Sequence, residues 1–326
     1  MNSFISGILE KGLGGEGITR EEALTITDLE GEDHWDLYYA AGKIARKFRG
    51  KEISLCTIVN ARSGLCSEDC KFCSQSSHYT TDVDTYDILS TESIVEAARA
   101  MDKTGADRFG IVTSGKGVGP KEMGAILEAV SSIRKTTGLE VCASLGVMSY
   151  EHLLRLKDAG LASYHHNIET APSFYSKICS THPYEDRART VRNAKRAGLS
   201  VCCGGIIGMG ESWSDRVEMA FTLKELDPDS IPINILNPVK GTPFENRPMT
   251  PPLEVLKTIS LFRFVNPTKS IRYAGGRERN MKELQALGLV AGLDGMLTGN
   301  YLTITGSKPD DDKRMVRNLG LSLKRG

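Results

Sequence analysis

The chain lacks an excess of charge of either sign, and it lacks any long apolar run. Its 326 residues carry 41 basic and 41 acidic side chains, so the formal net charge is zero. A balanced composition gives no electrostatic reason to bind nucleic acid or an anionic membrane surface. No run of about 18 apolar residues is present, which excludes a membrane-spanning helix. We therefore expect neither a nucleic-acid nor a membrane partner.

An export signal is also missing. Residues 1–15 contain no basic region followed by an apolar core and a small-residue cleavage site. Eight cysteines in a chain without such a signal are more typical of thiolate ligands or buried thiols than of disulfides. We therefore expect a cytoplasmic protein.

No low-complexity or linker segment marks a boundary between two large domains. A single barrel of roughly 250 residues with extensions accommodates the length of the chain. Residues 1–50 predict an N-terminal helical extension, with one helix that starts near 18–22 and a later one that contains Trp35 and Leu37. Residues 51–326 predict one domain.

Short β-rich runs recur from residue 52 onwards. They lie near residues 53–59, 107–113, 139–145, 162–168, 199–206, 230–236, 269–274 and 294–298. Amphipathic patterns with a period of 3.6 residues separate most of these runs, as in 94–101 and 123–133. Eight strands that alternate with helices predict parallel pairing and a closed (β/α)8 barrel of the TIM type, in the α/β class. An open doubly wound sheet is the alternative.

Four glycines support the same alternation. Gly105, Gly138, Gly160 and Gly198 each stand where a predicted helix ends just before a strand. This is the left-handed cap position that favours glycine. We therefore expect a positive φ at all four.

Three cysteines, Cys66, Cys70 and Cys73, form a C-x3-C-x2-C motif without a fourth cysteine at metal-ligand spacing. Four thiolates close every iron of a four-iron cluster, whereas three leave one iron with an open position, as a reactive cluster requires. A structural zinc site needs four ligands from cysteine and histidine, and His78 makes a C-C-C-H zinc site the alternative. The motif follows the first predicted strand, at the end of the barrel where active sites of this fold lie.

The motif, with an aromatic residue directly before its last cysteine, resembles the signature of the radical S-adenosylmethionine superfamily. Within that superfamily the chain resembles the biotin synthases, from roughly residue 20 to its end. The matching segments are, in order, 66–77, 166–170, 204–211, 240–243 and 271–278. The resemblance implies a sulfurtransferase that inserts sulfur from an auxiliary iron–sulfur cluster into dethiobiotin to give biotin.

The same resemblance implies a [4Fe-4S] cluster on the three-cysteine motif, whose open iron binds S-adenosylmethionine. One electron then cleaves the sulfonium and releases a 5′-deoxyadenosyl radical, and chelation holds the sulfonium against the cluster. The residues that it assigns to the cofactor are Phe72, Asn167, Glu169, Arg187, Gly205 and Ile207. Arg187 matches an arginine that pairs with the cofactor carboxylate. The family usually has aspartate where Glu169 stands, and the glycine run 204–210 lets the backbone approach a ligand closely.

A second set of chemically active side chains lies on alternate strands. Cys56, Cys142, Cys202 and Arg272 fall on the first, third, fifth and seventh predicted strands. Interior layers of a barrel draw four side chains from alternate strands, so these four can form one layer. A buried cysteine is usually a small hydrophobe. A buried arginine, however, needs an anionic partner, and an iron–sulfur cluster with thiolate ligands is one.

Biotin synthases carry an auxiliary cluster at this place, and Cys142, Cys202 and Arg272 match three of its ligands. The family's further cysteine is replaced here by Gly110, and Cys56 stands where the common form has serine. We therefore predict a rearranged site in which the three cysteines hold a four-iron cluster with an extra sulfide for donation. Arg272 either ligates this cluster or offsets its charge. The ordinary two-iron form is the alternative.

The resemblance also indicates the substrate contacts and the partners. Asn234 matches a residue that hydrogen-bonds the ureido ring of dethiobiotin, His165 replaces an asparagine commonly found beside it, and Asn167 lies close by. An electron donor such as flavodoxin or ferredoxin and a homodimer follow from the family. No acid–base residue is expected, because hydrogen-atom abstraction needs none.

Two cysteines are expected to be non-ligands. Cys203 directly follows Cys202 and points away from the barrel interior in a regular strand, and the position of Cys179 is often aliphatic in the family. Two other functions stay open. Gly110 and His165 would suit a related radical enzyme that performs a rearrangement or cofactor maturation. An iron–sulfur carrier or redox sensor would use the barrel without needing the cofactor residues.

Overall fold

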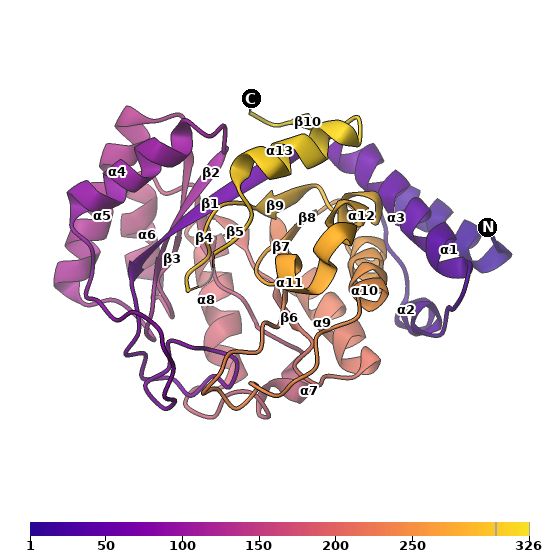
Figure 1. The fold of residues 1–326 in the computed structure, drawn as a ribbon, viewed down its shortest axis with the longest axis horizontal. Coiled ribbons are helices and arrows are strands. Elements are labelled where there is room, and N and C mark those ends of the chain that lie inside the picture. The colour runs from indigo at the N-terminus through magenta and orange to yellow at the C-terminus, as the bar shows by residue number, and fades with distance from the viewer. Residues whose placement is uncertain (304, 326) are drawn as a thin grey trace.

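Residues 1–303 and 305–325 are described by a computed structural model. Parallel strands form a barrel at its centre, and helices wrap around the outside (Figure 1). The strands are β1 (Glu52–Arg62), β2 (Arg108–Thr113), β3 (Glu140–Ser144), β4 (Ser163–His165), β5 (Ser200–Cys202), β6 (Gly205–Ile207), β7 (Ser230–Ile235), β8 (Ser270–Tyr273), β9 (Gly295–Leu297) and β10 (Ser322–Leu323).

The barrel closes because β1 pairs in parallel with both β2 and β9. Strands β5 and β6 both pair with β7, so they occupy one position in the ring, and eight positions result. The predicted closed (β/α)8 barrel is confirmed. The alternative, an open doubly wound sheet, is wrong, because β1 and β9 would then be edge strands that do not pair with each other. Outside the ring, β10 adds a short parallel pairing at the start of β1.

Helices fill the connections and both ends of the chain. They are α1 (Ser3–Gly14), α2 (Arg20–Thr27), α3 (Asp33–Arg49), α4 (Thr91–Asp102), α5 (Pro120–Thr136), α6 (Tyr150–Asp158), α7 (Pro172–Tyr175), α8 (Tyr184–Arg196), α9 (Trp213–Leu226), α10 (Pro252–Val265), α11 (Arg277–Met281), the 3-10 turn η1 (Lys282–Leu284), α12 (Gln285–Val290) and α13 (Pro309–Asn318). None of the described helices combines the length and the apolar character needed to cross a membrane.

The first three helices lie together along one side of the barrel, and α3 packs against α10 (Figure 1). The predicted start near residues 18–22 and the later helix with Trp35 and Leu37 are found as α2 and α3. The Thr19 side chain accepts a hydrogen bond from the Glu22 amide, while the Glu22 carboxylate accepts one from the Thr19 amide, so α2 begins with a capping box. Leu37 is buried on α3, whereas Trp35 on the same helix is exposed.

Three of the four cap glycines have the expected backbone. Gly105, Gly160 and Gly198 have φ of 81°, 104° and 73°. The prediction is wrong for Gly138, which is not among the residues with positive φ. A Cβ atom there would lie 2.6 Å from an Arg325 guanidinium nitrogen, so a larger residue would displace the end of that side chain.

A buried ion pair between Arg263 and Asp294 lies where the barrel closes. Arg263 on α10 donates to the Asp294 carboxylate at 2.9 Å, and the same oxygen accepts the Ile271 amide of β8 at 2.7 Å. The Asp294 carbonyl accepts the Ser54 amide of β1 at 3.1 Å. Burial by itself raises the pKa of Asp294, but Arg263 and Arg49 outweigh it and hold this pKa below its ordinary value. Asp294 thus ties α10, β8 and β1 together.

Replacing Asp294→Asn should destabilise the fold, because it leaves the fully buried Arg263 guanidinium without a counter-charge. The expected loss is about 3–5 kcal/mol in the free energy of unfolding, measured by urea denaturation. Asp227→Asn is the matched control. Asp227 pairs with Lys195 and Lys269 at an exposed site, so its loss should stay below about 1 kcal/mol.

The same variant pair predicts a pH dependence. The folded-state pKa of Asp294 lies below the unfolded value, so its stabilisation is present at neutral pH and is lost as the pH falls through the folded pKa. The stability gap between the parent chain and Asp294→Asn should therefore narrow on acidification. If Asp294→Asn at neutral pH lowers the free energy of unfolding no more than Asp227→Asn does, the role of this ion pair is contradicted.

Candidate active site

The three-cysteine motif lies in the loop that follows β1, among the long loops at the C-terminal ends of the strands (Figure 1). Backbone hydrogen bonds fold this loop back on itself. The Cys66 amide donates to the Gln75 carbonyl at 2.9 Å, the Ser77 amide to the Cys66 carbonyl at 2.8 Å, and the Cys73 amide to the Cys70 carbonyl at 2.9 Å. All three cysteines consequently line one cavity of about 240 Å³.

Arg187 and its neighbours form the opposite wall of this cavity, which Phe72 also lines. The guanidinium donates to the Glu169 carboxylate at 3.1 Å and to the Asn167 carbonyl at 3.1 Å. Its Nε donates to the Tyr175 hydroxyl at 2.8 Å, and its remaining nitrogen lies 3.9 Å from the Cys70 sulfur. A positive charge is thereby fixed beside the thiols, where it suits both a thiolate and the carboxylate of a ligand.

Glu169 occupies an unusual backbone conformation for a residue with a side chain. Its φ is +66°, in the left-handed region that non-glycine residues rarely adopt. The Ile206 amide donates to the Glu169 carbonyl at 2.7 Å and holds this turn. Burial raises the pKa of the Glu169 carboxyl, and Arg187 offsets only part of that rise. Strained residues of this kind concentrate at binding sites.

The approach of the glycine run to a ligand stays a prediction, and its glycines also have a structural reason. A Cβ atom on Gly204 would lie 1.9 Å from the Pro232 carbonyl oxygen, and one on Gly205 would lie 2.7 Å from the Glu169 carbonyl oxygen. These glycines allow close contact between segments of the protein itself. Ile207 is fully buried, and the described linings of the two central cavities include neither Gly205 nor Ile207.

The second set of residues converges inside the barrel. Cys56, Cys142, Cys202 and Arg272 lie on β1, β3, β5 and β8, which are the first, third, fifth and seventh positions of the ring, and all four are buried. The positive charge of Arg272 acts to lower the pKa of each of the three thiols, which places all of them within its electrostatic reach. Burial outweighs that effect and raises the pKa of Cys202 to about 11.

Several buried polar atoms in the barrel interior have no hydrogen-bond partner among the described residues. Arg272 donates to the Ser230 hydroxyl at 2.8 Å and to the Ser270 hydroxyl at 3.3 Å, but its third nitrogen, Nη1, is buried without a described partner. The same holds for Arg108 Nε and His165 Nε2. Buried polar groups without partners are rare in proteins, and a bound ion or water is one of the explanations for them. Guanidinium groups beside three thiols fit an anionic, thiolate-bound metal cluster.

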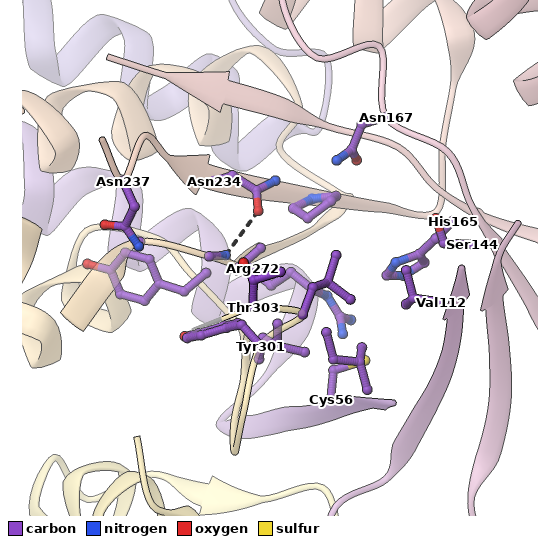
Figure 2. A pocket seen from close by; sticks show the side chains of 18 residues that line it. Cys56, Val112, Ser144, His165, Asn167, Asn234, Asn237, Arg272, Tyr301 and Thr303 are labelled. Carbon is purple, nitrogen blue, oxygen red and sulfur yellow. Dashed lines mark hydrogen bonds between the residues drawn. The ribbon is translucent and has the colours of Figure 1, made fainter. Parts of the chain in front are cut away.

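A second cavity, of about 260 Å³, lies between the two sets of cysteines. Figure 2 shows the side chains of Cys56, Arg272, His165 and Asn234 around it. It adjoins the first cavity, because a common set of residues lines both, namely Val112, Ser144, His165, Asn167 and Leu302. Burial, with Arg272 and Arg108 adding to it, lowers the pKa of His165 to about 3, so its imidazole is neutral and can both donate and accept.

Comparison with known proteins identifies the family. Residues 61–223 match the model of the radical SAM superfamily, and residues 232–322 match the biotin and thiamin synthesis associated domain. The biotin synthase of Pelotomaculum thermopropionicum is 50% identical over 97% of this chain and 98% of its own length. That of Acetivibrio thermocellus is 51% identical over 95% and 96%. The chain belongs to the biotin synthase family.

Two solved structures share the fold of this biotin synthase family member. A methylornithine synthase superposes with a TM-score of 0.85 over 98% of this chain and 97% of its own, at 22% identity. A maturase of the [FeFe]-hydrogenase superposes with a TM-score of 0.83 over 98% of this chain and 74% of its own, at 18% identity. The Radical SAM match and the biotin synthase relatives imply a [4Fe-4S] cluster and S-adenosylmethionine as cofactors.

Some residues of this biotin synthase site were not found from the sequence. The second cavity, which we call the inner cavity, is also lined by Asn237, Tyr301 and Thr303, which lie on loops without a recognised motif. Arg108 is a further such residue, since its charge offsets part of the rise that burial causes in the pKa of Cys142. The signal for Arg108 was its position at the start of a buried strand, where a cation needs a partner.

Cys203 and Cys179, the two cysteines that we predict to be non-ligands, lie in different surroundings. Cys203 is fully buried in the hydrophobic core. Cys179 lies 3.7 Å from the sulfur of Cys70. The zinc alternative with His78 finds no support, because the His78 ring instead contacts the Ser67 carbonyl at 3.0 Å. Within the described residues, the cysteine–histidine group close enough for a single ion does not contain His78.

Replacing Arg187→Gln should weaken binding of S-adenosylmethionine by about 10- to 100-fold, because a hydrogen bond to a charged group is worth about 1.5–3 kcal/mol. Equilibrium dialysis with the anaerobically reconstituted protein measures the affinity. Arg189→Gln is the matched control on the same helix, since Arg189 is exposed and pairs with Asp186. Equal affinities for the two variants would show that Arg187 does not contact the cofactor.

Proposed function

We propose that this chain converts dethiobiotin into biotin by radical insertion of sulfur. The observation that carries the proposal is the pair of adjoining cavities, one lined by Cys66, Cys70 and Cys73 and the other by Cys56 and Arg272. A substrate in the inner cavity would lie between a radical source at the mouth of the barrel and a sulfur source in its interior. The family to which the chain belongs supports this reaction.

Two bound groups would supply the chemistry. Cys66, Cys70 and Cys73 would hold the first cluster, with Arg187, Glu169, Asn167 and Phe72 around the cofactor. When bound, the first cluster and S-adenosylmethionine supply hydrogen-atom abstraction, and the auxiliary cluster supplies the sulfur atom.

The protein's own residues would hold the substrate in position and keep water away from it. Asn234 is fixed by the Gly275 amide, which donates to its Oδ1 at 3.0 Å, and its Nδ2 donates to the Gly205 carbonyl at 3.2 Å. The second hydrogen of its amide remains for a ureido oxygen. His165, uncharged, offers a donor or an acceptor to the same ring, and Asn167 stands at the junction of the two cavities. Holding the reacting carbons in one orientation replaces a random encounter with an intramolecular step.

The auxiliary cluster in this proposal has four irons, held by Cys56, Cys142 and Cys202, and an extra sulfide for donation. Support comes from the three buried thiols on alternate ring positions and from the unpaired nitrogen of Arg272, whose charge acts on all three thiols. Arg272 would ligate the cluster or offset its negative charge. We also infer an electron donor of the flavodoxin or ferredoxin type and a homodimeric state, as the family resemblance implies.

Anaerobic assay of the reconstituted chain with dethiobiotin, S-adenosylmethionine and a reductant tests the function, with biotin and 5′-deoxyadenosine measured separately. Cys73→Ala should abolish both products, because the first cluster loses a ligand. Cys202→Ala should still release 5′-deoxyadenosine but give no biotin, because only the sulfur source is lost. Cofactor cleavage by the parent chain without any sulfur-containing product would favour a related radical enzyme. Failure to bind S-adenosylmethionine would favour an iron–sulfur carrier.

Iron and sulfide analysis tests the composition of the auxiliary cluster. Two four-iron clusters predict about eight irons per chain, against about six for the two-iron alternative. Cys56→Ser should lower the iron content of the second site, whereas Cys203→Ser should leave it unchanged. One turnover should remove one sulfide from the second site. Two irons at that site in the parent chain would refute the four-iron form.

A further inference from the structure

A compact group of metal-binding side chains lies directly beside the three-cysteine motif. The sulfurs of Cys70 and Cys179 are 3.7 Å apart, and the Cys179 sulfur is 3.4 Å from His182 Nδ1. The three ligand atoms all lie within 4.8 Å of one another, and all three residues are buried. Neither Cys66 nor Cys73 belongs to this group among the described residues.

The spacing of the group suits one ion rather than a cluster. Two thiolate sulfurs bound at about 2.3 Å to one tetrahedral ion lie about 3.8 Å apart, and a sulfur and an imidazole nitrogen on the same ion lie about 3.6 Å apart. Both values are close to the distances found here. Cysteines that each bind a different iron of a four-iron cluster do not need this proximity.

A buried carboxylate lies beside this group without belonging to it. The Glu68 Oε2 lies 2.5 Å from His182 Nδ1, but Glu68 is not among the residues whose ligand atoms all lie within 4.8 Å of one another. The Thr181 hydroxyl donates to the same Glu68 oxygen at 2.7 Å, and Ser67 donates to the other at 3.0 Å. Three protein ligands leave the fourth position of a tetrahedral ion to a water molecule.

The protein positions these donors without any metal. The Lys71 amide donates to the Ile178 carbonyl at 2.9 Å, and the Asp69 carboxylate accepts the Ser180 amide at 2.8 Å. These bonds join the loop 66–73 to the loop 178–182, and we call this junction the loop seam. A site whose ligands are already placed pays less conformational entropy on binding.

We propose that Cys70, Cys179 and His182 form a mononuclear site for a borderline divalent cation, Fe²⁺ or Zn²⁺, in the chain that has not yet received its first cluster. Thiolate and imidazole ligands favour such ions over Mg²⁺ and Ca²⁺, which bind oxygen ligands. Binding releases the protons of the two thiols. Cys70 serves either this ion or the cluster, so the site exists only before cluster assembly. This inference goes beyond the proposed function.

Cobalt(II) titration of the full chain, stripped of iron and sulfide and kept anaerobic, tests the site. One Co²⁺ per chain should bind with thiolate-to-cobalt charge-transfer absorption and intense tetrahedral d–d bands. Cys179→Ser and His182→Gln should lose this spectrum. Cys73→Ser is the matched control, because it should keep the spectrum although it cannot hold the cluster. Circular dichroism checks that each variant is folded, and Cys179→Ala serves in place of any variant that is not.

Two results would overturn the proposal. One is loss of the cobalt spectrum in Cys73→Ser to the same degree as in Cys179→Ser, which would assign the ion to the three-cysteine motif. The other is the absence of thiolate-bound cobalt in the parent chain. No substrate is needed, so the outcome is independent of biotin formation.

Preloading separates the two natural cations. Zn²⁺ in the site should slow later assembly of the cluster at least severalfold, and Fe²⁺ should not, because iron can remain as part of the cluster. Cys179→Ser should abolish the difference between the two ions. An equal rate of assembly after both preloads in the parent chain would contradict a site that shares Cys70.

Discussion

The positive charge of Arg272 inside the barrel is the constraint around which the interior is organised. No described carboxylate pairs with it, and two serine hydroxyls account for its direct hydrogen bonds. A guanidinium in such a place is costly unless an anion accompanies it. In the proposed function, three cysteines on alternate ring positions would supply that anion by binding metal as thiolates. The second cysteine set and the unpaired Arg272 nitrogen would then balance each other's charge.

Other buried arginines in the same chain show the contrast. Arg263 has Asp294 at 2.9 Å, and Arg277 has Asp312 at 2.7 Å, so each carries its own carboxylate and fastens the structure. Arg272 differs from both because no described carboxylate pairs with it. Arg187 stands between the two cases, since it pairs with Glu169 and also lines the cavity of the three-cysteine motif.

Much of the fold was predictable because it depends on local patterns. The eight β-rich runs, the capping box at Thr19 and the alternate-strand placement of Cys56 and Cys142 all follow from periodicity and short-range hydrogen bonding. The break between β5 and β6 was not predictable, because it arises where Gly204 packs against the Pro232 carbonyl from another strand. The proximity of Cys179 to Cys70 was equally hidden, since 109 residues separate the two and only the loop conformations bring them together.

The loop seam has a mechanical consequence. Its hydrogen bonds run from the Lys71 amide and the Asp69 carboxylate to a segment more than a hundred residues away. The loop that carries the three-cysteine motif and the loop that carries Cys179 and His182 are therefore coupled, so that a shift of one displaces the other.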